Sequence, residues 1–173
     1  MRKRGVLVCA MLLAAFCGCG RAETVWETVD DELEQAAVQG GTPMEMVFDV
    51  PEGAEQVGLL DDCRVYAHPD GDYEITAQIL PGSDVSAVIQ TVSGFAPEQL
   101  RAVVRQEGCL PEYSFSWYAG GDGGGRLYRA EILADGAYCY ALTCSIREGM
   151  SPIYDSMQEQ VFASFGLISG EAV

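Results

Sequence analysis

Alternation of apolar and polar residues predicts most of the strands in this chain of 173 residues. Every second residue is apolar over 44–50, 63–67, 73–79, 113–117, 128–132 and 138–146. This period of two is typical of β-strands with one buried face. A shorter apolar run over 57–60 predicts either a strand or the lead-in to one.

Tight turns join the predicted strands into two units. Pro69-Asp70-Gly71 and Ala134-Asp135-Gly136 are each typical of a three-residue hairpin loop with a left-handed glycine. The glycine-rich run 120–125 is a further hairpin loop, so residues 113–146 are predicted to form a three-stranded meander. The expected cross-strand pairs are Val65 with Ile75, Cys63 with Ala77, Ile132 with Tyr138, and Ala130 with Tyr140.

Apolar residues at spacings of three and four predict four helices, over 22–39, 84–93, 97–107 and 151–165. Ser83 or Asp84 is the expected cap of the second helix. The order of elements predicts an α+β fold. We expect a single, mainly antiparallel sheet of about six strands in two hairpin or meander units, with helices packed on one face.

The first residues have the pattern of a secretory signal peptide. Arg2, Lys3 and Arg4 precede an apolar run, Val6–Phe16, which is shorter than the about 20 residues that a membrane-spanning helix needs. The sequence Phe16-Cys17-Gly18-Cys19 resembles a bacterial lipoprotein signal. This resemblance implies that Cys19 is lipidated and begins the mature chain. An ordinary cleaved signal without lipid and an uncleaved anchor are the alternatives.

These features divide the chain into four expected parts. Residues 1–18 are a lipoprotein signal peptide, 19–41 a lipidated tether with an acidic helix, 42–168 the α+β domain, and 169–173 a disordered tail. The tether helix carries Trp26, which is a candidate for a binding surface. Whether this helix docks on the domain or stays a free tether is left open by the sequence.

The charge of the chain excludes one class of partner. Its net charge is −16, and loss of residues 1–18 would leave seven basic and 26 acidic residues, a net charge of −19. A field of this sign opposes nucleic acid. The expected partners are membrane lipid, through Cys19, and a protein at the cell surface.

Four cysteines follow the predicted lipidation site: Cys63, Cys109, Cys139 and Cys144. An even number in an exported domain permits two disulfides. Cys139 and Cys144 have opposite parity on one strand, so they are not expected to bond to each other. One hypothesis pairs Cys63 with Cys144 and Cys109 with Cys139, and buried free thiols are the other. Their spacing fits no zinc site, so we expect no metal and no cofactor.

Few residues suit catalysis. The only histidine, His68, precedes Pro69 in a turn, which favours a structural role. Glu131 has the opposite parity to its apolar neighbours, which predicts a solvated position. Tyr118 falls on the same face as Glu131, where Arg105 or Arg129 would accompany it, and is the second candidate for a binding surface. We therefore predict a non-enzymatic binding or accessory module, with a small cell-envelope hydrolase that uses carboxylates as the alternative.

Short motifs add a resemblance over about residues 44–168. They are Ser93-Gly94-Phe95, Pro97-Glu98-Gln99-Leu100, and the ending Val161-Phe162-Ala163-Ser164-Phe165-Gly166-Leu167. With the order of elements, they are similar to small uncharacterised lipoproteins of Gram-positive gut anaerobes. Two hairpin units that flank helices also resemble, distantly, the Mog1/PsbP-like fold. The resemblance implies a membrane-anchored extracytoplasmic lipoprotein and supplies no catalytic residues.

Overall fold

The computed structural model describes residues 41–60, 62–106, 110–120 and 124–169. The chain divides into two units, 1–31 and 32–173, and all described residues belong to the second. The predicted tether helix with Trp26, the lipidation site Cys19 and the tail 170–173 lie outside the described residues.

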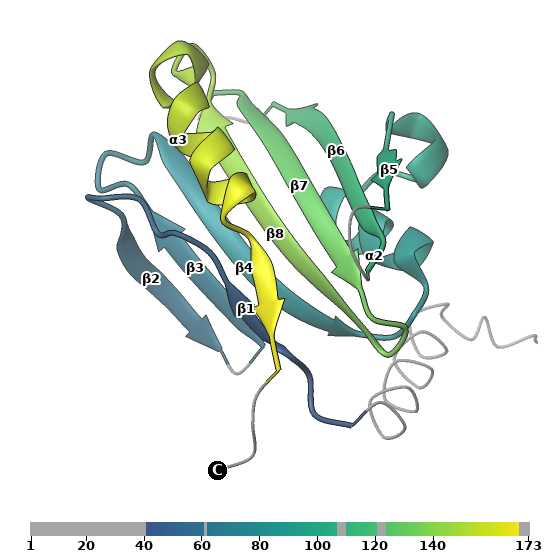
Figure 1. Ribbon diagram of the computed structural model, residues 1–173. Helices are drawn as coiled ribbons and strands as arrows, with labels where there is room; N and C mark the ends of the chain where they lie inside the picture. The colour runs from purple at the N-terminus through teal and green to yellow at the C-terminus, as the bar shows by residue number, and fades with distance from the viewer. Residues whose placement is uncertain (1–40, 61, 107–109, 121–123, 170–173) are drawn as a thin grey trace, which may run out of the picture. The chain divides into compact units, whose positions relative to one another are not determined.

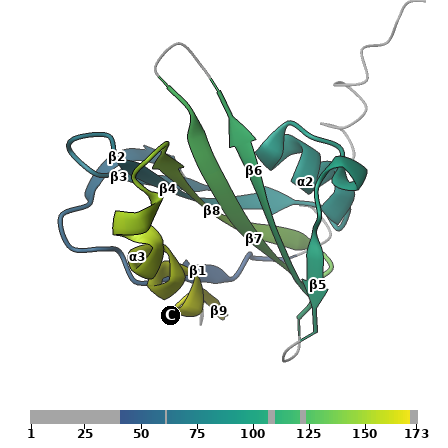
Figure 2. The same ribbon diagram turned by 90° about the horizontal axis from the view of Figure 1, so that it is seen from above.

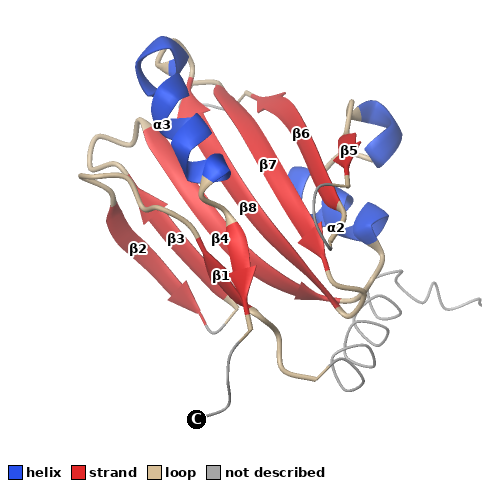
Figure 3. Cartoon of the chain, viewed as in Figure 1, coloured by secondary structure: helices blue, strands red, loops and turns tan. Residues whose placement is uncertain are grey.

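Strands dominate the described part of the chain, together with two α-helices and one 3-10 turn (Figure 3). Their bounds are β1 Glu45–Val47, β2 Glu55–Leu60, β3 Cys63–Ala67, β4 Tyr73–Pro81, α2 Val85–Ser93, the 3-10 turn Pro97–Gln99, β5 Val103–Arg105, β6 Glu112–Ala119, β7 Arg126–Ala134, β8 Tyr138–Arg147, α3 Ser151–Ala163 and β9 Gly166–Ile168. Seven strands form an antiparallel sheet in the order β2-β3-β4-β8-β7-β6-β5 (Figure 1). Strands β1 and β9 form a separate antiparallel pair.

The sheet is covered on both faces, as Figure 2 shows from above. We call these the α3 face and the α2 face. On the α3 face, α3 and β1 pack on β4 and β8; the buried residues include Met46, Ile75, Tyr140, Leu142, Cys144, Val161 and Phe162. On the α2 face, α2 packs on the other side of the meander; the buried residues include Val88, Ile89, Phe115, Trp117, Ile132, Cys139 and Ala141.

The predictions of a single six-stranded sheet and of helices on one face were therefore wrong. The reason lies in β8, whose residues of both parities are apolar and buried. Such a strand needs cover on each side, and α2 and α3 supply it from opposite sides. The strand predicted over 44–50 forms only as β1, which pairs with β9 above the α3 face instead of joining the sheet.

Both predicted hairpin registers were wrong by an odd number of residues. In the first hairpin the His68 N–H donates to the Tyr73 carbonyl (3.1 Å), so Asp72 joins the loop and Ile75 lies opposite Tyr66. In the second, the Asp135 N–H donates to the Tyr138 carbonyl (3.1 Å), which leaves a shorter loop than predicted. Ile132 consequently lies opposite Ala141. A shift of this kind turns every side chain of one strand to the other face.

The two helices of the domain begin where the sequence predicts. Asp84 caps α2, because its Oδ1 accepts hydrogen bonds from the N–H groups of Ser86 (3.0 Å) and Ala87 (3.2 Å). Helix α3 begins at Ser151, and Ile153 in its first turn is exposed although it is apolar. The stripe that packs on the sheet instead consists of Tyr154, Met157, Val161 and Phe162.

The helix predicted over 97–107 was wrong. Only the 3-10 turn Pro97–Gln99 forms, and the chain then extends into β5 at the edge of the sheet. Val103 and Val104 are both exposed there. Two adjacent β-branched residues suit an extended edge strand at least as well as a helical stripe.

Candidate binding surfaces

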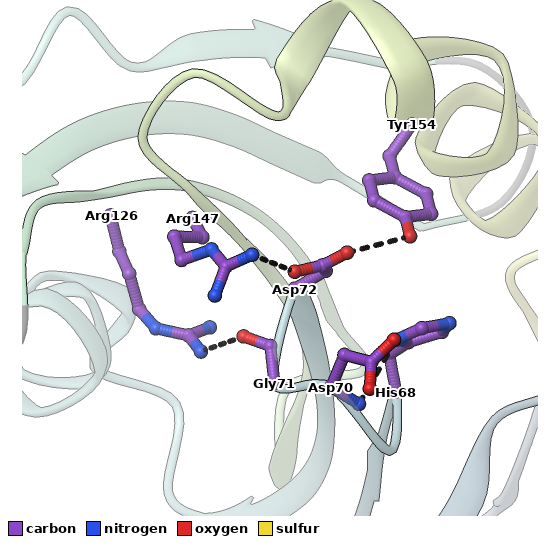
Figure 4. A network of polar contacts seen from close by, with 7 residues as sticks. All are labelled: His68, Asp70, Gly71, Asp72, Arg126, Arg147 and Tyr154. Carbon is purple, nitrogen blue, oxygen red and sulfur yellow. Dashed lines mark hydrogen bonds and ion pairs between the residues drawn. The ribbon is translucent and has the colours of Figure 1, made fainter.

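A polar network fastens the β3–β4 loop to the rest of the domain (Figure 4). The carboxylate of Asp72 is buried, with the residue 6% exposed. It accepts a hydrogen bond from the Tyr154 hydroxyl of α3 (3.0 Å) and forms an ion pair with Arg147 at the end of β8. Arg126 of β7 donates to the Gly71 carbonyl of the same loop (2.6 Å). These contacts join four elements and leave the Asp72 carboxylate committed to structure.

His68 belongs to the same network. Its Nδ1 accepts a hydrogen bond from the Asp70 N–H (3.2 Å), and its ring packs against the rings of Tyr73 (5.3 Å between centroids) and Tyr154 (5.9 Å). Among the described residues, no Ser or Cys side chain forms a hydrogen bond with this ring. Within the same residues, no group of three His, Cys, Asp or Glu side chains is placed to hold a metal ion.

The α3 face is open where it extends over β6, and Tyr118 lies there. The register places Ser116 opposite Arg129 and Tyr118 opposite Leu127, so Tyr118 and Arg129 share a face, as expected. Tyr118 is 52% exposed, and its hydroxyl donates to the Glu148 carboxylate (2.9 Å). Its ring covers Gly125, where even a Cβ atom would lie 1.7 Å from the hydroxyl oxygen.

Glu131 is not solvated, contrary to the prediction. It lies on the expected face but is only 5% exposed. Its carboxylate accepts a hydrogen bond from Arg129 (2.7 Å), whose guanidinium lies 4.4 Å over the Phe162 ring of α3. Burial raises the pKa of Glu131, and the ion pair with Arg129 opposes that rise. Held in this way, the carboxyl is closed to a polymeric substrate.

Strand β2 at the other edge of the sheet is the most exposed apolar element. Val57 is 62% exposed, and Leu59 and Leu60 are each 70% exposed. Among the described residues the strand has a neighbour, β3, on one side only. A β-bulge at Val57 interrupts their register. Sequence reasoning placed a short strand here but missed its exposure, because an apolar run gives no sign of lying at an edge.

The described cysteines, Cys63, Cys139 and Cys144, are free thiols. Cys63 pairs with Gln78 of β4, whereas Cys144 pairs with Ile75, which places the two thiols on opposite faces of the sheet. The hypothetical Cys63–Cys144 bridge is therefore absent. Cys109, the hypothetical partner of Cys139, lies outside the described residues. Burial raises the pKa of both Cys139 and Cys144 to about 11.

Comparisons with known proteins support the fold alone. No family model and no curated protein matches the chain. A protein of Bacteroides thetaiotaomicron is similar in structure, with a TM-score of 0.51 at 11% identity over 72% of this chain; the chain spans about half (46%) of that protein. LpqN of Mycobacterium tuberculosis, described as involved in cell envelope biogenesis, has a TM-score of 0.50 at 14% identity, covering 74% of this chain and 87% of LpqN.

A PsbP protein is also among the solved structures that are similar to the chain. Cyanobacterial PsbP from Synechocystis has a TM-score of 0.49 at 16% identity, covering 75% of this chain and 96% of PsbP. A likeness at this level carries no argument about function. Separately, neither helix of the described residues is long and apolar enough to cross a membrane.

The buried thiols lead to a first prediction. Iodoacetamide at pH 8 should leave Cys139 and Cys144 unmodified in the folded protein, because both are inaccessible and protonated. Unfolding without reductant should expose both to rapid alkylation, as measured by peptide mass spectrometry. If Cys139 stays unmodified after unfolding, it is bridged, and the free-thiol assignment fails.

A second prediction concerns Glu131 and pH. Its raised pKa means that the folded state binds this proton more tightly than the unfolded state does. The stabilising effect of this protonation is therefore complete below the unfolded pKa of about 4.5 and is lost as pH rises through the folded pKa. Urea unfolding at a series of pH values should measure this loss. As pH rises from below 4.5 through the folded pKa, the free energy of unfolding of the wild-type protein should fall relative to that of Glu131→Gln. A difference between the two that does not change with pH would contradict the shift.

Proposed function

We propose that this protein is a membrane-anchored extracytoplasmic lipoprotein that works without catalysis, by binding a protein partner along strand β2. The observation that carries the binding role is the exposure of Val57, Leu59 and Leu60 along an unpaired sheet edge. The anchoring role rests on the signal-like residues that precede Cys19.

An open strand edge is suited to one kind of partner. The outer backbone N–H and C=O groups of β2 have no neighbouring strand in the part of the chain that the structure describes, and such groups are a template for another chain. Native proteins usually place Lys or other charges on such an edge, yet Leu59 and Leu60 project from β2 and are exposed. A partner strand with apolar side chains would cover them.

Charge decides between a second copy of this chain and a different protein. Glu55 begins β2 and Asp62 follows its end, and neither carboxylate has an ion-pair partner among the described residues. An antiparallel second copy would bring the acidic end of one strand near the acidic end of the other, within a molecule of net charge −16. The partner that fits is a strand with an apolar centre and Lys or Arg at both ends.

Anchoring and binding complement each other in this proposal. Lipidation of Cys19 would hold the protein stably at the membrane, since two or more acyl chains suffice where one is marginal. The domain would then present β2 to proteins at the cell surface. Glu131, the one carboxyl with a raised pKa among the described residues, is buried against Arg129, which does not suit the alternative of a carboxylate hydrolase.

The anchoring is tested by Cys19→Ser. We expect this variant to move from the membrane fraction to the medium, because no acyl chain can be attached. Cys17→Ser is the matched control and should stay with the membrane. Cell fractionation and immunoblotting measure both, and a membrane-bound Cys19→Ser variant would refute lipid anchoring at this residue.

The binding edge is tested with strand-forming peptides that have a Val/Thr centre. A peptide with Lys at both ends should slow hydrogen exchange of the β2 amides, and a peptide with Glu at both ends should not. Leu59→Lys should abolish the effect, whereas Val103→Lys, at the opposite edge of the sheet, should preserve it. Self-association that Leu59→Lys removes would instead identify a second copy as the occupant and overturn the proposal.

A further inference from the structure

We propose that a groove over β5 and β6 binds a small ligand through an oxyanion, a carboxylate or phosphate group, held between Arg101 and Arg129. The groove has a volume of about 380 Å³ and is lined by Arg101, Val103, Ser114, Phe115, Ser116 and Arg129. This volume is within the range of small-molecule sites. The groove and β2 are at opposite edges of the sheet, so this site is separate from the proposed protein-binding edge.

Strand pairing arranges the donors of the groove in one row. Ser116 of β6 lies opposite Arg129 of β7, and Ser114 lies opposite Val103 of β5. Arg101 lies two residues before Val103, so it reaches the level of Ser116 on the outer side. Neighbouring strands are about 4.8 Å apart, and the two arginines therefore flank Ser116 across roughly 10 Å. Guanidinium forks at this separation suit an oxyanion bound above the serine.

Most side-chain hydrogen-bond donors that line the groove have no partner among the described residues. Arg101 forms no hydrogen bond or ion pair with any described residue, and the hydroxyls of Ser114 and Ser116 form none either. Arg129 uses one nitrogen on Glu131 and lies against Phe162, which fixes its position while other N–H groups stay available. The row thus combines one held arginine, one unpaired arginine and two free hydroxyls.

Charge specifies the ligand class. The ion pair with Glu131 balances Arg129, and Arg105 at the far end of β5 lies 3.9 Å from the Glu112 carboxylate. Arg101 is then the unbalanced cation of the groove. In a chain with 26 acidic and ten basic residues, an unpaired arginine beside free hydroxyls selects an anionic group locally. Val103 adds an exposed apolar side chain that suits the body of a small ligand.

The test uses the full-length protein in uncharged detergent, titrated with inorganic phosphate and with butyrate at constant ionic strength. We expect at least one of them to shift the NMR signals of the Ser116 and Arg129 amides saturably, while chloride does not. Saturable shifts with phosphate would identify a phosphate ligand, and saturable shifts with butyrate would identify a carboxylate ligand. Arg101→Gln should weaken this binding at least about tenfold, equivalent to about 1.4 kcal/mol. Arg64→Gln, the same charge change on β3, should leave it unchanged.

Glu131→Gln should change the affinity for the probe in the opposite direction from Arg101→Gln. Without this carboxylate, Arg129 has no ion-pair partner among the described residues and its positive charge is available to an anion in the groove. We therefore expect tighter binding of the same probe. Equal weakening by Arg101→Gln and Arg64→Gln would show a general charge effect and overturn the proposal. Shifts that do not saturate, or weaker binding by Glu131→Gln with an unchanged fold, would also overturn it. Leu59→Lys should not alter the titration, which keeps this result distinct from the test of β2.

Discussion

The central strand β8 is the constraint on which the rest of this domain depends. Side chains of both parities along β8 are apolar or small, and nearly all of them are buried. A strand of this kind is stable only between two covered faces, because apolar surface left in water costs about 25 cal/mol per Å². Helix α3 and the β1–β9 pair cover one face and α2 covers the other, while β4 and β7 occupy both edges of β8.

This arrangement also decides which surfaces remain for binding. Helix α3 reaches β7 through the contact of Phe162 with Arg129, and beyond that point the α3 face over β6 is open. The same contact holds Arg129, the ion-pair partner of the buried Glu131, at the border of the groove. At the opposite edge, β2 is separated from β8 by β3 and β4 and retains exposed leucines. The helices therefore cover the central strands of the sheet and leave side chains of both edge strands exposed.

Much of the local structure could be predicted from the sequence. The meander over 113–146, the Asp84 cap and the start of α3 at Ser151 follow from short-range patterns and are present. Tyr118 and Arg129 were placed on one face by parity alone. The register failed because neither loop consists of the residues predicted for it, which shifts the first hairpin by one residue and the second by three. The loop residues depend on hydrogen bonds such as that from the His68 N–H to the Tyr73 carbonyl. Glu131 was misplaced because it lies on the face of the sheet on which α3 packs, and α3 is a segment about 30 residues further along the chain.

The sequence by itself determined where both α-helices of the domain and most of its strands begin, the acidic charge of the chain and the lipoprotein-like start. These properties depend on neighbouring residues, whose periodicity and capping act within a few positions. Only the tertiary structure decided that helices cover both faces, that Val103 and Val104 extend an edge, and that Leu59 is exposed. Strand order and face cover arise from contacts between distant segments, and a local pattern of apolar residues does not specify which segment supplies the cover.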